Sequence, residues 1–311
     1  MTVSRASPQG VIAWKLLEKL LTEQPNPASD AIDKMATEEA LRVINAEDQK
    51  VALAVEREIP AIARAVDAMV AAIEKGGRIF YLGAGTSGRL GVLDASEIPP
   101  TFSAPPEMVQ GIMAGGEAAL SRATEASEDD PTLGARDLLA RGFTAKDALV
   151  GIAASGRTPY VLGAIAEAKR LGAVTIGLCC VPSAELSSAV DFPIAPLVGP
   201  EIVAGSTRMK SGTAQKLVLN MLSTATFIRL GYVYGNLMVN VQPKNEKLVD
   251  RARRIIMKAT GVTAERAMDL LKESGMRVRT AIVMGKAGVT CEEADRRLSE
   301  AHGRVRLALG E

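Results

Sequence analysis

Residues 79–102 read IFYLGAGTSGRLGVLDASEIPPTF, and this stretch decides the fold of the region around it. It begins as an apolar run typical of a buried strand, breaks into the glycine-rich turn GAGTSG, and continues as a helical segment that carries Glu97. We expect Pro99 and Pro100 to end that helix. A helix N-terminus presents unpaired N–H groups and a positive dipole end, which favour phosphate. A phosphate-binding turn beside a carboxylate predicts an enzyme that acts on a phosphorylated small molecule.

Strand-like and helical segments alternate after this unit. The expected strands are 79–82, 108–113, 148–153, 174–179 and 192–198, and the expected helices are 88–97, 116–142, 158–171, 184–190 and 206–230. Short apolar runs that alternate with helices predict a parallel sheet covered on both faces. The fold class is therefore α/β, with three layers.

Helical patterns flank the α/β region on both sides. A helical leader is expected over 1–45, with a helix at 7–24, and the α/β domain over 46–245, where Pro60 marks a break or kink in the first helical stretch. The strand signal disappears after 245, so 246–311 predict a small helical domain.

The composition excludes several classes of function. The 311 residues include 37 basic and 36 acidic side chains and 3% aromatics, which argues against nucleic-acid binding. Neither a secretory signal nor a membrane span is evident, so we expect a cytoplasmic protein. The three cysteines and the single histidine, His302, predict no disulfide framework and no metal site. Because the chain has only one histidine, we expect carboxylates to perform any acid–base chemistry, and we expect no cofactor.

The GAGTSG turn matches GxGxxG, but neither nucleotide motif fits. A dinucleotide site requires an acidic residue at the end of the second strand, and Glu117 comes only after a Gly pair. A P-loop requires Lys and Ser or Thr where this chain has Arg89 and Leu90.

Similar turns recur at 154–159 (ASGRTP) and 205–213 (GSTRMKSGT). Turns that follow parallel strands meet at the carboxyl edge of the sheet, so the three turns could form one phosphosugar site. Any one of their hydroxyls could instead cap a helix. The candidate binding residues are Thr86, Ser87, Gly88, Ser155, Gly156, Arg157, Thr158, Glu201, Ser206, Thr207 and Lys210.

Two acidic regions could supply catalysis. Glu97 lies in DASEIPP, and Glu125, Glu128, Asp129 and Asp130 form the cluster TEASEDDP. Taken alone, the cluster is more typical of a solvated helix end. Two carboxylates at one site could nevertheless divide the acid and base roles.

Long motifs then match a known family. GAGTSGRLGVLDASE-x-PPTF, EASEDD, ASGRTPYV and GSTRMKSGTAQKLVLNMLST resemble N-acetylmuramic acid 6-phosphate etherases, members of the sugar isomerase (SIS) superfamily, from about residue 28 onward. The resemblance implies a homodimer with an SIS domain and a small C-terminal bundle similar to ubiquitin-associated domains. It also implies cleavage of the lactyl ether of the substrate, which gives N-acetylglucosamine 6-phosphate and D-lactate in cell-wall sugar recycling.

The resemblance also assigns roles by motif. Glu97 matches the family's proton donor and Glu128 its second essential acid, while Ile98 stands where the family often has Cys. We therefore expect Glu97 as acid and Glu128 as base, and the division of roles is less secure than the pair. Two alternatives stay open at this point: a phosphosugar isomerase with Glu201 as base, and a non-catalytic sugar-phosphate sensor similar to glucokinase regulatory protein.

Overall fold

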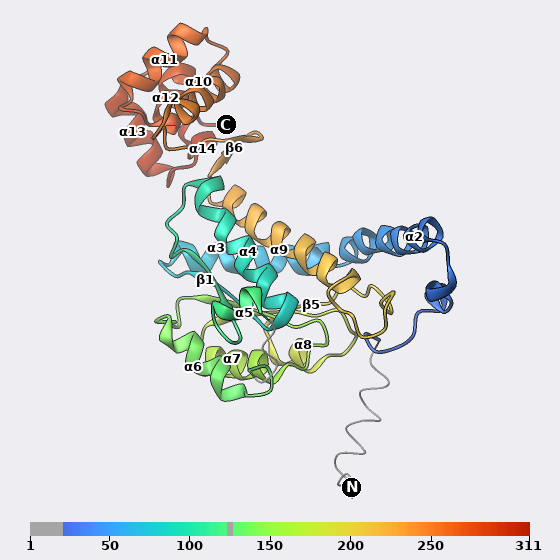
Figure 1. The fold of residues 1–311 in the computed structure, drawn as a ribbon. Coiled ribbons are helices and arrows are strands. Elements are labelled where there is room, and N and C mark those ends of the chain that lie inside the picture. The colour runs from blue at the N-terminus through green and yellow to red at the C-terminus, as the bar shows by residue number, and fades with distance from the viewer. Residues whose placement is uncertain (1–20, 123–126) are drawn as a thin grey trace, which may run out of the picture. The chain divides into compact units, whose positions relative to one another are not determined.

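A computed structural model describes residues 21–122 and 127–311 (Figure 1). The described chain divides into two compact units, the first up to Ser96 and over 107–222, the second over 97–106 and 223–311. The helix predicted for 7–24 falls mostly outside the described residues, and 21–24 form a turn.

The first unit is built on a five-stranded parallel sheet with the order β2-β1-β3-β4-β5. Its strands are β1 (Ile79–Gly83), β2 (Val109–Met113), β3 (Ala148–Ile152), β4 (Val174–Leu178) and β5 (Phe192–Ile194). The central strands β1 and β3 are buried along their whole length, because helices cover both faces. The predicted three-layer α/β fold is confirmed, although β5 is shorter than expected.

Helices connect and cover these strands. They are α2 (Thr37–Glu56), α3 (Ile59–Glu74), α4 (Gly85–Phe102), α5 (Ala118–Ser121), α6 (Pro131–Ala140), α7 (Pro159–Arg170), α8 (Glu185–Ala189) and α9 (Lys210–Arg229), after two 3₁₀ turns, η1 (Pro27–Ser29) and η2 (Ile32–Lys34). Pro60 lies in the first turn of α3, where its missing N–H costs nothing, so the expected break is confirmed. In the described part of the segment predicted as one helix over 116–142, the structure has two helices, α5 and α6.

The prediction that Pro99 and Pro100 end the first long helix is wrong. Both prolines lie inside α4, which continues to Phe102 and ends as Ser103 adopts a left-handed φ of 51°. The fixed φ of proline is compatible with a helix, so only the last turn of α4 loses N–H donors. The Ser103 N–H donates to the Pro99 carbonyl at 2.9 Å and completes that turn.

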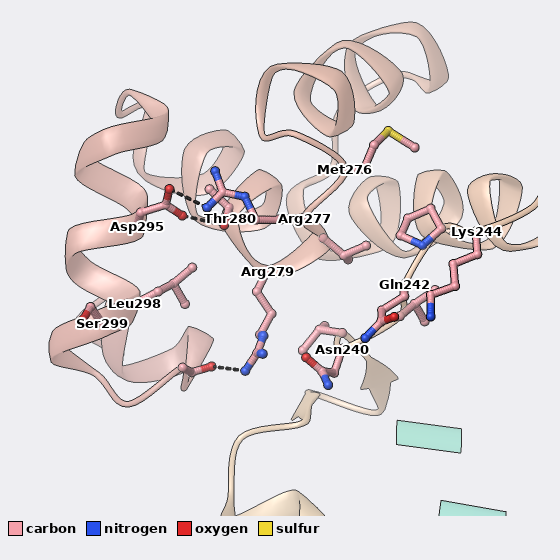
Figure 2. Close-up of a pocket in the computed structure, with 15 residues that line it drawn as sticks. Asn240, Gln242, Lys244, Met276, Arg277, Arg279, Thr280, Asp295, Leu298 and Ser299 are labelled. Carbon is pink, nitrogen blue, oxygen red and sulfur yellow. Dashed lines mark hydrogen bonds and ion pairs between the residues drawn. The ribbon is translucent and has the colours of Figure 1, made fainter. Parts of the chain in front are cut away.

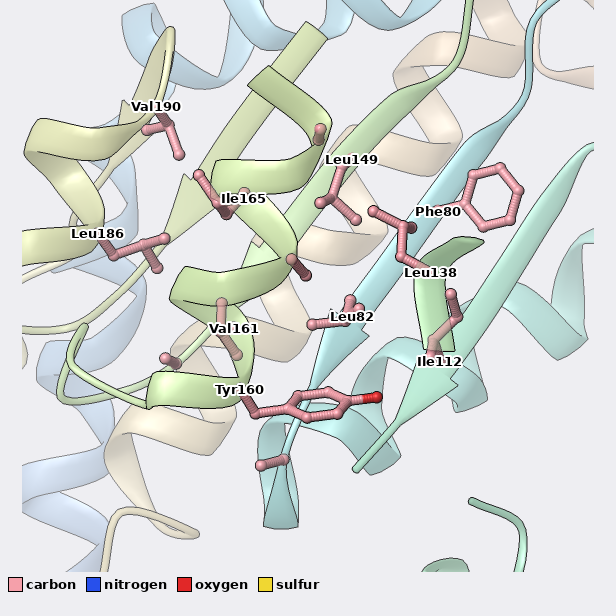
Figure 3. Packing of buried hydrophobic residues seen from close by; sticks show 14 of the residues in the cluster. Phe80, Leu82, Ile112, Leu138, Leu149, Tyr160, Val161, Ile165, Leu186 and Val190 are labelled. Carbon is pink, nitrogen blue, oxygen red and sulfur yellow. The ribbon is translucent and has the colours of Figure 1, made fainter. Parts of the chain in front are cut away.

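The two faces of the sheet carry different helices. On one face Val161 and Ile165 of α7 pack over Leu82 and Leu149 of the strands (Figure 3). On the other face α4 approaches so closely that a Cβ on Gly91 would lie 3.0 Å from the Cβ of Tyr81. The helices that follow the neighbouring strands β1 and β3 therefore lie on opposite faces, and this reversal creates a crevice at the carboxyl ends of β1 and β3.

Helix α9 lies beside α4 within the first unit (Figure 1). Ser87 Oγ of α4 donates to Gln215 Oε1 of α9 at 3.0 Å, and Asn220 Nδ2 donates to Asp94 Oδ1 at 2.8 Å. These contacts hold the start of α9 close to the start of α4.

The second unit contains a short hairpin, β6 (Val233–Tyr234) and β7 (Leu237–Met238), and a helical bundle. Its helices are α10 (Glu246–Thr260), α11 (Ala264–Glu273), α12 (Val278–Ala287), α13 (Cys291–Glu300) and α14 (Val305–Ala308). The expected helical C-terminal region is confirmed, and it has its own apolar core. Among the described helices, none has the length and apolarity to cross a membrane.

Candidate active site

The turn after β1 brings strand and helix into near contact. A Cβ on Gly88 would lie 2.5 Å from the Gly83 carbonyl oxygen, so only glycine fits there. Helix α4 begins at Gly85, whose φ is 53°, and not near residue 88 as predicted. Thr86 and Ser87 consequently belong to the first helical turn.

The polar groups of this first turn have separate tasks. Ser87 is 8% exposed, and its hydroxyl donates a hydrogen bond to Gln215 of α9, so it holds the two helices together. The Thr86 methyl faces α9, because a Cβ on Gly212 would lie 3.4 Å from Thr86 Cγ2. The backbone of this turn is therefore the part suited to an anion.

The turn after β3 is also tight. Gly156 has a φ of 64°, and a Cβ there would lie 2.4 Å from the Cβ of Ala184. The Arg157 N–H donates to Ser155 Oγ at 3.3 Å. Thr158 occupies the N-cap of α7, but its side chain makes no capping hydrogen bond. The half-buried hydroxyls of Ser155 and Thr158 thus stand at the crevice beside the start of α7.

The third turn differs from the other two. Helix α9 begins at Lys210, so the half-buried Ser206 and Thr207 lie in the turn before it. Glu201 is fully buried, and its carboxylate accepts hydrogen bonds from the N–H groups of Lys210 and Ser211, both at 2.9 Å. A carboxylate of the protein therefore already occupies this helix N-terminus, and the expectation of a helix start open to phosphate does not hold here.

The Lys210 side chain is also directed into the protein. It is 1% exposed, and its Nζ lies 2.7 Å from Glu47 Oε2 of α2. Burial raises the pKa of Glu47, but hydrogen bonds from Lys210, Lys50 and Asn26 outweigh it and lower the pKa to about 2. Sequence reasoning missed Glu47 and Asn26, because neither lies in a recognisable motif.

The structure places Glu128 at the crevice. It is half-buried in the turn between α5 and α6, and a Cβ on Gly85 would lie 3.4 Å from its Oε1. Its carbonyl oxygen accepts a hydrogen bond from the Tyr160 N–H at 3.1 Å, in the first turn of α7. Glu128 is therefore next to the starts of both α4 and α7.

The rest of the acidic cluster is separate from this position. Asp130 caps α6 by accepting a hydrogen bond from the Thr132 N–H at 2.8 Å, and hydrogen bonds from the Thr132 side chain and backbone lower the pKa of Asp130. Asp129 is exposed, and Glu125 lies outside the described residues. One short stretch therefore contains both a helix cap, Asp130, and the candidate site residue, Glu128.

Glu97 is exposed on α4, while its neighbour Ile98 is 3% exposed. A helix rises about 1.5 Å per residue, so about 18 Å of helix axis separate Gly85 from Glu97. Glu128 lies at the Gly85 end of this helix. Of the two predicted catalytic carboxylates, Glu128 belongs to the first compact unit and Glu97 to the second.

Comparison with known proteins identifies the family. The chain is 56% identical over 266 residues to an N-acetylmuramic acid 6-phosphate etherase of Jannaschia sp. (strain CCS1), covering 86% of this chain and 84% of that protein. It is also 56% identical to the Aeromonas hydrophila etherase, covering 86% and 90% of the two chains. The chain belongs to the N-acetylmuramic acid 6-phosphate etherase family. The family resemblance of the motifs is thereby confirmed.

Two further comparisons agree with the fold of this etherase family member. Residues 61–169 match the family described as glucokinase regulatory protein N-terminal SIS domain. The structure of a phosphoheptose isomerase from Francisella tularensis aligns with a TM-score of 0.50 at 22% identity, covering 62% of this chain and 98% of that chain. The first unit is accordingly an SIS fold.

Proposed function

We propose that the protein cleaves the D-lactyl ether of N-acetylmuramic acid 6-phosphate and releases N-acetylglucosamine 6-phosphate and D-lactate. The activity is that of a carbon–oxygen lyase, and identity of 56% with etherases over 86% of the chain supports it. We place it in the cytoplasm, in recycling of cell-wall amino sugars, and it needs no cofactor.

The phosphate of the substrate would bind at the crevice between β1 and β3. Helix α4 begins at that edge, and the glycines at 83 and 88 allow close approach of the strand and helix backbones. Ser155, Gly156, Arg157 and Thr158 would complete the phosphate site from the second turn. The Thr158 hydroxyl supports this role, because it makes no capping hydrogen bond at its own helix.

The role of the third turn is indirect in this proposal. Glu201 and Lys210 have internal partners and are at most 1% exposed, so they would position the turn rather than contact the sugar. Ser206 and Thr207 are half-buried in that turn, where they could still contact the substrate.

The chemistry needs one base and one acid. In the open-chain sugar, the aldehyde acidifies the proton on carbon 2. Glu128 would remove this proton, and Glu97 would protonate the lactyl oxygen as its bond to carbon 3 breaks, leaving an unsaturated aldehyde and lactate. Water then adds at carbon 3. Each carboxylate contributes a factor of about 10²–10⁴ when its pKa and position suit the step.

A homodimer would explain how the two carboxylates meet. Glu128 lies at Gly85, and about 18 Å of helix axis separate Gly85 from Glu97. In this proposal Glu97 of the partner subunit faces Glu128 across a two-fold interface. Leu93 on α4 and Met221 on α9 support such an interface, because they are 51% and 38% exposed.

The observation that carries the proposal is the position of Glu128 at the shared start of α4 and α7. The test is to incubate the protein with N-acetylmuramic acid 6-phosphate and to assay D-lactate, with Glu97→Gln as the comparison. We expect release by the native chain and a loss of about 10²–10⁴-fold in the variant. Phosphosugar binding without lactate release would instead identify a sensor, and normal release by Glu97→Gln would remove the acid assignment.

A further inference from the structure

The second unit contains a cavity that the proposed reaction does not use. Its volume is about 690 Å³, and all its lining residues belong to the second unit. Figure 2 shows Asn240, Gln242 and Lys244 on one side and Arg279, Leu298 and Ser299 on the other. Cavities of about 300–1,000 Å³ are typical of small-molecule sites.

The charges around this cavity are unbalanced. Three cations, Lys244, Arg277 and Arg279, face a single carboxylate, Asp295. That carboxylate is already engaged: Arg277 Nη1 lies 2.7 Å from Asp295 Oδ2, and Thr280 Oγ1 donates to Asp295 Oδ1 at 2.9 Å. Lys244 and Arg279 are left without a counter-ion in the cavity.

Arg279 is the more informative of the two. In the described chain no carboxylate pairs with it, and its Nη1 donates only to the Gly303 carbonyl, at 3.1 Å. Its Cζ lies 5.9 Å from the centre of the Tyr232 ring. Burial lowers the pKa of the Arg279 guanidinium, and the nearby Tyr232 opposes this shift. A partly desolvated guanidinium with spare donors is stabilised by an anion that takes up those donors.

The remaining lining suits a polar ligand of moderate size. Asn240 Nδ2 is hydrogen-bonded to the Phe102 carbonyl at 2.8 Å, which leaves its side-chain oxygen as an acceptor for hydroxyl groups. Gln242 and Ser299 are exposed and add further polar groups, while Met276 and Leu298 provide an apolar wall. The lining therefore combines cations for an anionic group with acceptors for a hydroxylated body.

We propose that this cavity is a second anion site that binds a small phosphate ester between Arg279 and Lys244. A phosphate presents several oxygens in different directions, so it can bridge two cations on opposite walls, whereas a carboxylate presents two oxygens in one plane. The site is independent of the crevice in the first unit, since the two share no residue.

Two methionines allow the two sites to be observed separately in the full chain. Met276 lines the cavity and is 37% exposed, whereas Met113 of β2 lies against the start of α4, where a Cβ on Gly88 would be 3.0 Å from its Cγ. The experiment labels methionine methyl groups with ¹³C and titrates the protein with inorganic phosphate. We expect a saturable shift of the Met276 signal, and a much smaller shift with acetate at equal concentration. No shift with phosphate, or an equal shift with acetate, would overturn the proposal.

Charge variants provide the second arm of the experiment. Lys244→Gln and Arg279→Gln should each weaken the Met276 titration by about tenfold or more, since each removes a charge-assisted hydrogen bond. Arg279→Lys should retain part of the affinity. Lys258→Gln, which replaces an exposed cation of α10 outside the cavity, is the matched control and should leave the Met276 titration unchanged.

Thermal unfolding identifies any variant that has lost its fold. Because Lys244 is exposed, its replacement should leave the fold intact. Unchanged Met276 titrations in both Gln variants would contradict the assignment.

Discussion

The starts of α4 and α9 look alike in sequence and differ in structure. Both follow a turn rich in Gly, Ser and Thr, and they lie side by side, joined by the hydrogen bond between Ser87 and Gln215. At α9 a buried carboxylate of the protein, Glu201, accepts the first N–H hydrogen bonds. At α4 the neighbouring carboxylate is Glu128, which lies beside Gly85 and is only half-buried.

This difference separates a binding end from a structural end. The fully buried Glu201 carboxylate accepts the first N–H groups of α9 and leaves no room there for a substrate phosphate, whereas the start of α4 beside Glu128 remains partly exposed. We infer that the turn before α4 binds the substrate and that the turn before α9 holds the start of α4 in position. Each prediction below tests one side of this division.

The largest effect is expected at Glu128. Glu128→Gln keeps the shape of the side chain but removes the base, so kcat for D-lactate release should fall by about 10²–10⁴-fold with little change in the thermal midpoint. Asp129→Asn, its exposed neighbour, is the matched control and should retain native kcat. A Glu128→Gln enzyme with native kcat would show that the α4 end has no catalytic carboxylate.

On the α9 side, Lys210→Met should lower the free energy of unfolding by about 3–5 kcal/mol, because it removes the buried cation that pairs with the buried Glu47. Urea denaturation measures this loss. Lys216→Met, at an exposed position of α9, should change stability by less than about 0.5 kcal/mol. Equal effects of the two substitutions would mean that the buried ion pair is not important to the fold.

Glu201→Gln is the direct counterpart of Glu128→Gln. It should lower the free energy of unfolding by about 1–3 kcal/mol, since it weakens two charge-assisted hydrogen bonds to buried N–H groups. Its kcat, measured where the variant is fully folded, should fall far less than that of Glu128→Gln. A larger loss of kcat than of stability would place Glu201 in the chemistry.

The sequence predicted the fold almost completely and the site in part. Short apolar runs bounded by glycines located the five parallel strands of the sheet, because these patterns depend only on residues that are close together in the sequence. The tolerance of α4 for Pro99 and Pro100 was missed, since it depends on where the helix ends in three dimensions. The contrast between the helix starts was also invisible, because Glu201 and Glu47 act through contacts that close only on folding.

The same reasoning applies to the acids. The family motif selected Glu128 from an acidic stretch, and the structure adds that Asp130 caps α6 whereas Glu128 lies beside Gly85. Residue type alone does not separate a helix cap from a candidate catalytic acid. The role depends on whether the carboxylate faces the N–H groups of a helix start or the crevice.

The ion pair of Glu47 also predicts a pH dependence of stability. The folded pKa of Glu47, about 2, is below its ordinary value of 4.5, so its contribution to stability is fully present above pH 4.5 and is lost as the pH falls toward 2. The difference in thermal midpoint between the native chain and Glu47→Gln should therefore shrink over that interval. A constant difference would contradict the lowered pKa of Glu47.

The central claim is that Glu128 at the α4 start works with Glu97 of the partner subunit. The most direct measurement mixes the Glu97→Gln and Glu128→Gln chains, unfolds and refolds them together, and assays D-lactate. If the two acids come from different subunits, each mixed dimer holds one intact site, and random pairing should restore about a quarter of native activity. If activity stays at the level of the single variants, the acids belong to one chain and the account of the site is contradicted.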